Sequence, residues 1–448
     1  MKKILYLDYL VFISVSVEVI FRDYLDLDGL KLELLVVSLY VFLKGWKRFG
    51  DLLHPYVLFL LCYNMFLNSR VFIDLVNGKP FYYTTYFSNY PFSYGTQVNM
   101  LLMLNLSLVC INLGQEIALH FSGLKKLELS RNNTWLFFSK FVMCVFLLPV
   151  LLYFFQVARE FLLNGYGGIS SITKHSILSH AVTFFQIGFY AFLASKPSLK
   201  QLKIYGSIFV ITLFLSIFSG ARNMFATQIL MLLSYFSLYV KKISQIVVVF
   251  FITIGAIFFE LFGGVRDDPQ NVNMMEYFVS TEESIAEIFF RHQGVTITVL
   301  GYADELAEQS SVMDVVYPIY EYFGEKMIDD YEPKDVNFGH KVSFLINPSF
   351  YYSGHGTGTS FLAELYSAGG FVSVMVGSFL LSFFVIYSIY TYGSSTMGCL
   401  LLLIFFKYLY FMPRAGYLAF LSDVLKWYVI ICILKKIYNL FHKRKEYE

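Results

Sequence analysis

Charged residues are scarce in this chain. Asp, Glu, Lys and Arg together make up 15% of its 448 residues, whereas 57% are hydrophobic. Soluble globular domains carry about 25% charged residues, so the composition excludes an ordinary soluble protein. Apolar stretches of about 17 to 22 residues recur along most of the chain, and each is long enough to cross a bilayer as a helix. The sequence therefore predicts an all-α polytopic membrane protein.

Signals for several other classes of site are also missing. No spacing typical of a metal site is present, so no metal or cofactor is expected. The net charge of +2 gives no reason to expect nucleic acid as a partner. No small-residue cleavage site follows the first apolar segment, so a retained first helix is expected. All five cysteines fall inside predicted spans, where they are expected to act as small apolar side chains: Cys62, Cys110, Cys144, Cys399 and Cys432.

The apolar stretches predict about twelve transmembrane helices. The first two are short and carry Asp8, Glu18 and Glu33, so they fit the pattern of a transmembrane helix least well. The predicted spans cover residues 4–21, 30–43, 52–69, 98–119, 134–157, 177–195, 203–219, 222–240, 244–262, 370–391, 396–412 and 415–434.

Basic residues predict the orientation, because Lys and Arg accumulate in short cytoplasmic loops. With the N-terminus inside, just over half of the 34 basic residues fall in inner segments, and the first outer turn, Asp23 to Asp28, is acidic. Both termini are therefore expected in the cytoplasm. The inner basic segments are 2–3, 44–48, 125–131, 196–203, 241–242 and 435–445.

One outer segment is far longer than the others. Residues 263–358 are more polar than the flanking spans and are expected to form an extracytoplasmic loop or cap between spans nine and ten. It divides the chain into a transmembrane bundle at 1–262, the loop itself, and spans ten to twelve with a basic tail at 359–448. A helix is expected from a capping box at Ser280 to Glu283 until a stop at Gly294.

Four arginines depart from the inside-positive pattern. Arg222 and Arg414 lie in tight outer turns, Arg266 follows the ninth span, and Arg291 lies in the large loop. Snorkelling to the interface explains such positions singly, and a surface ion pair with Glu287 is an alternative for Arg291. Arginine holds phosphate oxygens in a bidentate manner, so the four together predict a site for an anionic ligand.

Three residues are candidates for proton transfer. His292 follows Arg291, His355 lies in the glycine-rich segment 354–360, and Glu364 lies one turn into the next helix. Glycines and a helix N-terminus favour an anion, although a flexible turn with a helix cap explains the segment equally well. An ionisable group at membrane depth is a functional candidate by default. The order of preference as a base is Glu364, His355 and then His292.

Three motifs resemble the bacterial O-antigen and capsular polysaccharide polymerases of the Wzy family. They are Gly220-Ala221-Arg222 at the start of a span, the segment 290–295 in the large loop, and the segment 358–370 with Glu364. The resemblance spans most of the chain and implies a GT-C-like membrane glycosyltransferase in the bacterial cytoplasmic membrane. It implies joining of repeat units carried on undecaprenyl pyrophosphate, at the outer face and without a cofactor.

The residues agree with the chemistry that the resemblance implies. The outer arginines are suited to stabilising a departing pyrophosphate, and the three candidates above to accepting a proton from the attacking hydroxyl. Membrane lipids, a chain-length regulator (copolymerase) and a flippase are the expected partners. A ligase acting on the same lipid-linked donor would show the same arginines. A flippase or transporter would instead place its ionisable groups near the bilayer midplane.

Overall fold

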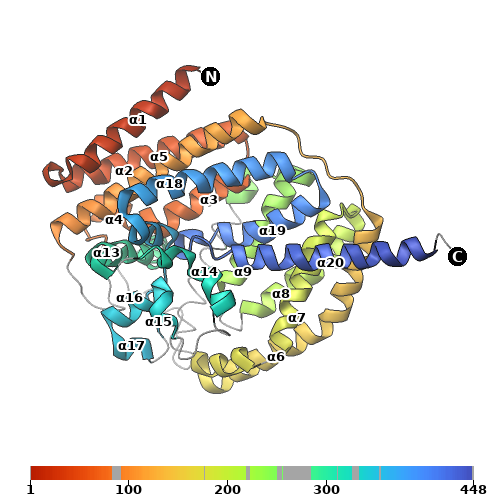
Figure 1. The fold of residues 1–448 in the computed structure, drawn as a ribbon. Coiled ribbons are helices and arrows are strands. Elements are labelled where there is room, and N and C mark those ends of the chain that lie inside the picture. The colour runs from red at the N-terminus through yellow and green to blue at the C-terminus, as the bar shows by residue number, and fades with distance from the viewer. Residues whose placement is uncertain are drawn as a thin grey trace.

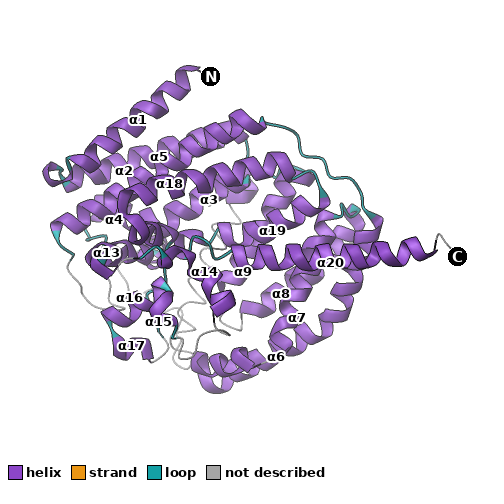
Figure 2. Cartoon of the chain, in the orientation of Figure 1, coloured by secondary structure: helices purple, strands orange, loops and turns teal. Residues whose placement is uncertain are grey.

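A computed structural model describes residues 2–82, 92–175, 177–217, 222–249, 255, 284–309, 311–324, 332–352 and 355–445. These residues form helices joined by short connections, and none of them is in a strand (Figure 2). The all-α prediction is therefore confirmed for the described part of the chain. The structure and the apolar helices described below agree with a polytopic membrane protein.

The N-terminal helices end at clear capping signals. Asp26 accepts a hydrogen bond from the Gly29 N–H at 3.0 Å at the start of α2, and Gly50 ends that helix with a φ of 63°. A π-helical turn over Asn64–Asn68 connects α3 to α4, and π turns are common at functional positions. The helices are α1 (Lys2–Ile20), α2 (Leu27–Phe49), α3 (Pro55–Tyr63), α4 (Ser69–Asn77) and α5 (Tyr94–Ser122).

The central helices form an antiparallel group that lies apart from α5 (Figure 1). Pro149 lies inside the longest helix. A proline frees a backbone carbonyl from its helical hydrogen bond, and in membrane proteins neighbouring helices or side chains satisfy such a group. The members of this group are α6 (Asn133–His175), α7 (Ile177–Ala194), α8 (Leu199–Ile217) and α9 (Arg222–Tyr235), which continues as a π turn over Phe236–Val240.

The described parts of the predicted large loop contain several short helices. The longest of them, α14 (Met313–Gly324), has 12 residues. The others are α12 (Ile285–Gln293), α13 (Ile297–Glu305), α15 (Pro333–Val336), α16 (Phe338–Ile346) and α17 (Pro348–Tyr352). They gather at one end of the bundle, beside α4 and the start of α18 (Figure 1).

Three helices complete the chain: α18 (Phe361–Tyr392), α19 (Thr396–Leu409) and α20 (Leu421–Lys445). The backbone of α18 is non-helical at Gly369 and Gly370, where Gly370 has a φ of 61°. Only glycine adopts that conformation without strain. The kink separates a short first segment, which carries Glu364, from the long remainder of the helix.

The centre of the bundle is the pairing of α5 with α18, which run side by side (Figure 1). Small residues allow the close approach that membrane helices need. A Cβ at Gly114 would lie 2.3 Å from the Phe379 carbonyl oxygen, and the Ser378 hydroxyl bonds the Ser107 hydroxyl at 3.0 Å. In the most apolar window of α5, 89% of residues are buried, against 28% in that of α6. Therefore α5 is central, and α6 presents most of its surface outward.

Six helical segments among the described residues are long and apolar enough to cross a membrane. The predicted count of twelve stays a prediction, because α1 and α2 are not among the six. The helices 178–194 and 396–409 are apolar but shorter, and most of the predicted ninth span, 244–262, lies outside the described residues. The six segments are Pro55–Asn77, Tyr94–Ser122, Asn133–Glu160, Leu199–Ile217, Asn223–Val240 and Phe361–Tyr392.

Candidate functional site

The candidate site is built around the end of α12. This helix begins after Ser284, whose hydroxyl accepts from the Glu287 N–H at 3.2 Å, and it ends at Gln293 before Gly294. The predicted stop at Gly294 is confirmed. The N-cap is Ser284, while the expected capping box at 280–283 lies outside the described residues. The last turn of α12 presents Arg291, His292 and Gln293 in sequence, and all three side chains are partly exposed.

The end of α12 is held against the first turn of α4. The Ser69 hydroxyl donates to the Phe290 carbonyl at 2.9 Å, and Arg70 Nε donates to the Arg291 carbonyl at 2.8 Å. The Phe290 carbonyl also accepts from the Gly294 N–H, so the two side chains of α4 tie down the backbone at the C-terminal end of α12. The π turn before Ser69 thus leads into residues that fix the position of Arg291.

A glycine makes this close approach possible. A Cβ at Gly294 would lie 2.4 Å from the Ser69 hydroxyl and 2.8 Å from Arg70 Cγ. Any side chain there would force α12 and α4 apart. Gly294 is therefore required by packing, whereas its φ of −74° is open to other residues.

A second set of contacts, farther from the site, also holds α12 in place. Lys79 Nζ lies 3.0 Å from Glu287 Oε1, and Asn77 Nδ2 donates to the same oxygen at 2.8 Å. The hydrogen bond from Lys79 is the main reason that the pKa of Glu287 is below its ordinary value. Glu287 therefore has partners on α4 and the segment after it, in addition to the i, i+4 pairing with Arg291 considered above.

The last outer turn reaches the end of α12. Residues Met412–Arg414 form a 3-10 turn after α19, in which the Arg414 N–H donates to the Phe411 carbonyl at 2.8 Å. Arg414 Nη1 lies 3.4 Å from Gln293 Oε1. This contact brings the segments that carry Arg291 and Arg414 together, although 123 positions separate the two arginines in the chain.

Glu364 forms a hydrogen bond with the chain just after the same turn. It is fully buried, and its Oε2 accepts from the Tyr417 N–H at 2.8 Å while its Oε1 accepts from the Thr359 hydroxyl at 2.9 Å. The Tyr317 side chain is a further hydrogen-bond partner. These donors are all neutral. The carboxyl group therefore links the start of α18, α14 and the chain that follows Arg414.

Gly416 leaves the space that this arrangement needs. A Cβ there would lie 2.9 Å from Glu364 Oε1 and 2.7 Å from the Tyr317 hydroxyl. The predicted tight turn at 413–416 is thus a turn packed onto a carboxyl group, and the glycine allows the contact.

The other predicted residues fall into two groups. Arg222 is the first residue of α9, and its side chain and all of Arg266 lie outside the described residues. His355 lies in an exposed segment before α18, whose N-cap is Ser360. The described structure therefore brings Arg291, His292, Arg414 and Glu364 to one region and does not test whether Arg222 and Arg266 join them.

Sequence reasoning missed Arg70 and the neutral partners of Glu364. Arg70 is buried and follows an apolar stretch directly, which is the signal that singled out Arg266. The same criterion applied to residues 52–70 would have found it. Tyr317 and Tyr417 carry no such signal, because their role depends on contacts with a distant helix.

The region combines cationic and proton-accepting groups at a polar end of an apolar bundle. Arginine side chains there are suited to binding phosphate oxygens, and the imidazole of His292 can donate or accept a hydrogen bond. Among the described residues, no group of three or more His, Cys, Asp or Glu is placed to hold a metal ion.

Comparison with known proteins gives one match. Neither the curated proteins nor the solved structures include a match to this chain. A family model described as O-antigen polysaccharide polymerase Wzy matches residues 4–445, which is nearly the whole chain. The match agrees with the all-helical, membrane-spanning fold and confirms the resemblance seen in the sequence. The chain therefore belongs to the Wzy family of O-antigen polysaccharide polymerases.

Proposed function

We propose that this polymerase joins oligosaccharide repeat units carried on undecaprenyl pyrophosphate, at the outer face of the cytoplasmic membrane. Its site is the region where α12, the Arg414 turn and the start of α18 meet. The contact between Arg414 and Gln293 carries the proposal, because it brings the two arginine-bearing segments together.

The arginines act on the leaving group. When the acceptor hydroxyl attacks the anomeric carbon of the donor glycan, negative charge grows on the departing pyrophosphate. Arg291 and Arg414, placed before the reaction begins, stabilise that charge without reorganisation. Arg222 and Arg266 are proposed to contribute to the same anion site from α9 and the segment after it. Arg70 holds the backbone of Arg291 and so positions it.

Burial separates the three candidates for the base. A base must touch the acceptor hydroxyl, and His292 is partly exposed beside Arg291 and Gln293. Glu364 is fully buried and bonded to the Arg414 turn, which favours a positioning role. His355 is exposed on the segment before α18. We therefore assign proton transfer to His292 first, with His355 second, and the positioning of the turn to Glu364.

Contacts between predicted inner segments support the orientation. Lys242 Nζ lies 3.4 Å from the Phe49 carbonyl oxygen, and Trp46 Nε1 donates to Gln245 Oε1 at 3.0 Å. The Asn132 N–H donates to the Ser195 carbonyl at 3.2 Å. Segments with a basic excess thus lie next to one another, as expected for one cytoplasmic face with both termini inside. The candidate site is formed by segments assigned to the opposite face.

A GT-C-like architecture, a copolymerase partner and a flippase that delivers the substrate are parts of the same proposal. The ligase and transporter alternatives make different products. A ligase transfers a finished glycan once to another acceptor, and a transporter moves it without elongation.

The test uses purified full-length protein in detergent, supplied with lipid-linked repeat units. A ladder of products that differ by one repeat unit is expected. One-step transfer to a different acceptor would support the ligase, and no new glycosidic bond would overturn the proposal. The absence of compartments in detergent excludes transport as the source of a ladder.

Variants of Glu364 separate a base from a positioning residue. Glu364→Gln keeps an oxygen that accepts from the Tyr417 N–H, so a positioning role predicts that most of kcat is retained. Glu364→Ala removes the hydrogen bonds that hold the turn and should lower kcat and raise KM together. Loss of kcat in Glu364→Gln by a factor of about 10² or more, the range of general base catalysis, would return the base role to Glu364.

A further inference from the structure

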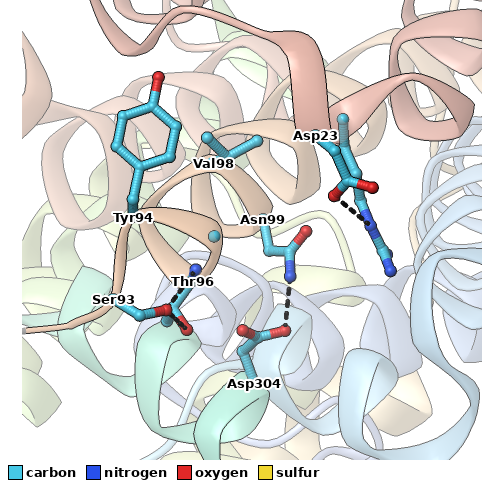
Figure 3. Close-up of a pocket in the computed structure, with 9 residues that line it drawn as sticks. Asp23, Ser93, Tyr94, Thr96, Val98, Asn99 and Asp304 are labelled. Atoms are coloured by element: carbon cyan, nitrogen blue, oxygen red, sulfur yellow. Dashed lines mark hydrogen bonds and ion pairs between the residues drawn. The ribbon is translucent and has the colours of Figure 1, made fainter.

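A polar pocket lies beside Asp304, in the last turn of α13 (Figure 3). Its volume is about 400 Å³, within the range of about 300 to 1,000 Å³ that small-molecule sites occupy. It is lined by Arg22, Asp23, Ser93, Tyr94, Gly95, Thr96, Val98, Asn99 and Asp304. These residues come from the turn between α1 and α2, the first turns of α5, and the end of α13.

The pocket has a fixed floor and an exposed rim. Thr96 and Val98 are buried, whereas Tyr94 is 54% exposed and the Asp23 side chain is 87% exposed. The floor is tied to the loop helix, because the Thr96 hydroxyl donates to Glu305 Oε1 at 2.9 Å. A ligand can therefore enter from outside without displacing a helix.

Asp304 links the pocket to the helix of the candidate site. It accepts from Asn99 Nδ2 at 2.9 Å (Figure 3) and from the Tyr366 hydroxyl at 2.6 Å. Tyr366 lies two residues after Glu364 in α18. Since α13 has nine residues, the pocket lies roughly 13 Å along that helix from the end of α12. A chain of several sugar rings can bridge such a distance, and a single ring cannot.

The donors and acceptors fit hydroxyl groups. A hydroxyl both donates and accepts, and the pocket offers carboxylates as acceptors beside a guanidinium and an amide as donors. Asn99 Oδ1 is buried and has no hydrogen-bond partner among the described residues. Asn99 lines the pocket, so a rotation of its side chain would bring the amide within reach of a bound hydroxyl. The mixed charge of Arg22 and Asp23, which lie 4.0 Å apart, does not favour an anion.

We propose that this pocket is a glycan subsite that binds a hydroxyl-rich sugar of the repeat unit, several rings away from the bond that is formed. The subsite rests on the proposed function, and it adds a determinant of substrate specificity that the arginine region does not contain. It holds the repeat unit through its sugars while Arg291 and Arg414 hold the pyrophosphate end.

The pocket contains a position suited to a direct test. A Cβ added at Gly95 would have one neighbour within 4 Å, Ser93 Oγ at 3.9 Å. Because Gly95 lines the pocket and its Cβ position is open, Gly95→Phe is expected to fill part of the pocket, and Gly95→Ala is the matched control. Tyr94→Ala is a second variant; it removes the exposed rim and the bond from the Tyr94 hydroxyl to the Leu25 carbonyl at 2.9 Å, so it should also weaken binding.

The experiment measures binding of the free one-repeat-unit oligosaccharide, released from its lipid carrier, to the full-length protein in detergent. The dissociation constant should rise about tenfold or more in Gly95→Phe, as expected when one or two net hydrogen bonds are lost. It should change by less than about twofold in Gly95→Ala, which removes no hydrogen bond. Equal binding by Gly95→Phe and the unmodified protein, or no binding by the unmodified protein, would overturn the subsite. If Gly95→Phe does not fold, unchanged binding by Tyr94→Ala has the same meaning.

Elongation assays distinguish the two proposals. If the protein binds the oligosaccharide through this pocket but makes no ladder, the polymerisation proposal fails and the subsite stands. If it elongates normally and Gly95→Phe changes neither binding nor the KM of the lipid-linked unit, the subsite alone fails.

Discussion

Two polar regions of this apolar molecule differ in how their charges are satisfied. In the first, between α1, α2 and α5, Lys44 Nζ lies 2.6 Å from Asp8 Oδ2 and 3.1 Å from Glu116 Oε1. Asp8 also accepts from Tyr40 and Asn112, each at 2.7 Å. In the second, at the start of α18, Glu364 is bonded to neutral donors and Arg414 contacts a neutral amide.

This difference indicates which region is structural. Charges that meet their opposites inside a bundle hold helices in register, and removal of one partner leaves an uncompensated charge. The second region is held differently, because neutral hydrogen bonds to Glu364 fix the turn that carries Arg414. We therefore regard the Asp8–Lys44–Glu116 cluster as structural and the region of Arg414 as the one that binds a charged substrate.

The largest effect is expected at His292. His292→Gln removes the proton acceptor and should lower the elongation rate by about 10²- to 10⁴-fold, which is the usual contribution of a general base. The measurement is the initial rate per folded molecule. His355→Gln is the matched control and should retain most of the rate, so the reverse result would exchange the two roles.

Arg414→Ala should lower the rate by about 10²- to 10³-fold, because one preorganised group that stabilises the leaving charge is lost. Arg414→Lys should recover part of the rate, since a point charge replaces the bidentate group. Thermal unfolding in detergent should be nearly unchanged in both. A normal product ladder from Arg414→Ala would break the proposed distinction between the regions.

Asp8→Asn tests the other region. It should lower the free energy of unfolding by about 3 kcal/mol, at the low end for a broken buried ion pair because Lys44 keeps Glu116. The elongation rate per folded molecule should stay within about threefold of the unmodified rate, a difference well below the effect of removing a catalytic group. Loss of rate without loss of stability would mean that this cluster also takes part in the reaction.

The smallest expected effect is a change in the stability of α12 with pH. Since contact with Lys79 lowers the pKa of Glu287 below its ordinary value of 4.5, the ionised form stabilises the folded protein. That contribution is fully present above about pH 4.5 and is lost as the pH falls through the lower, folded-state pKa. Amide exchange in α12 should increase over that range and should not do so in Glu287→Gln. Equal pH dependence in both proteins would contradict the assignment.

The sequence predicted more of the fold than of the site. Composition and the length of the apolar stretches identified the membrane class, and a glycine after an amphipathic segment correctly marked the end of α12. The arginines at 291 and 414 were chosen by their departure from the charge rule alone. The partners that place them were not predictable, because Arg70 with Arg291 and Glu364 with Tyr417 are joined by helix packing across distant parts of the chain.

Burial of Glu364 illustrates the same limit. Its position one turn into an apolar helix made it the first choice for a base, but position along a helix does not reveal which side chains surround it. The structure encloses the carboxyl group between Thr359, Tyr317 and the Tyr417 N–H. Those contacts changed its proposed role from proton transfer to positioning.

The most direct measurement is photocrosslinking of the purified protein with an undecaprenyl-pyrophosphate-linked repeat unit that carries a photoreactive group beside the pyrophosphate. The labelled peptides should come from the end of α12 and the turn 412–417, and labelling should fall in Arg414→Ala. Labelling confined to peptides around Lys44 and Glu116, with none at α12 or residues 412–417, would contradict the placement of the site.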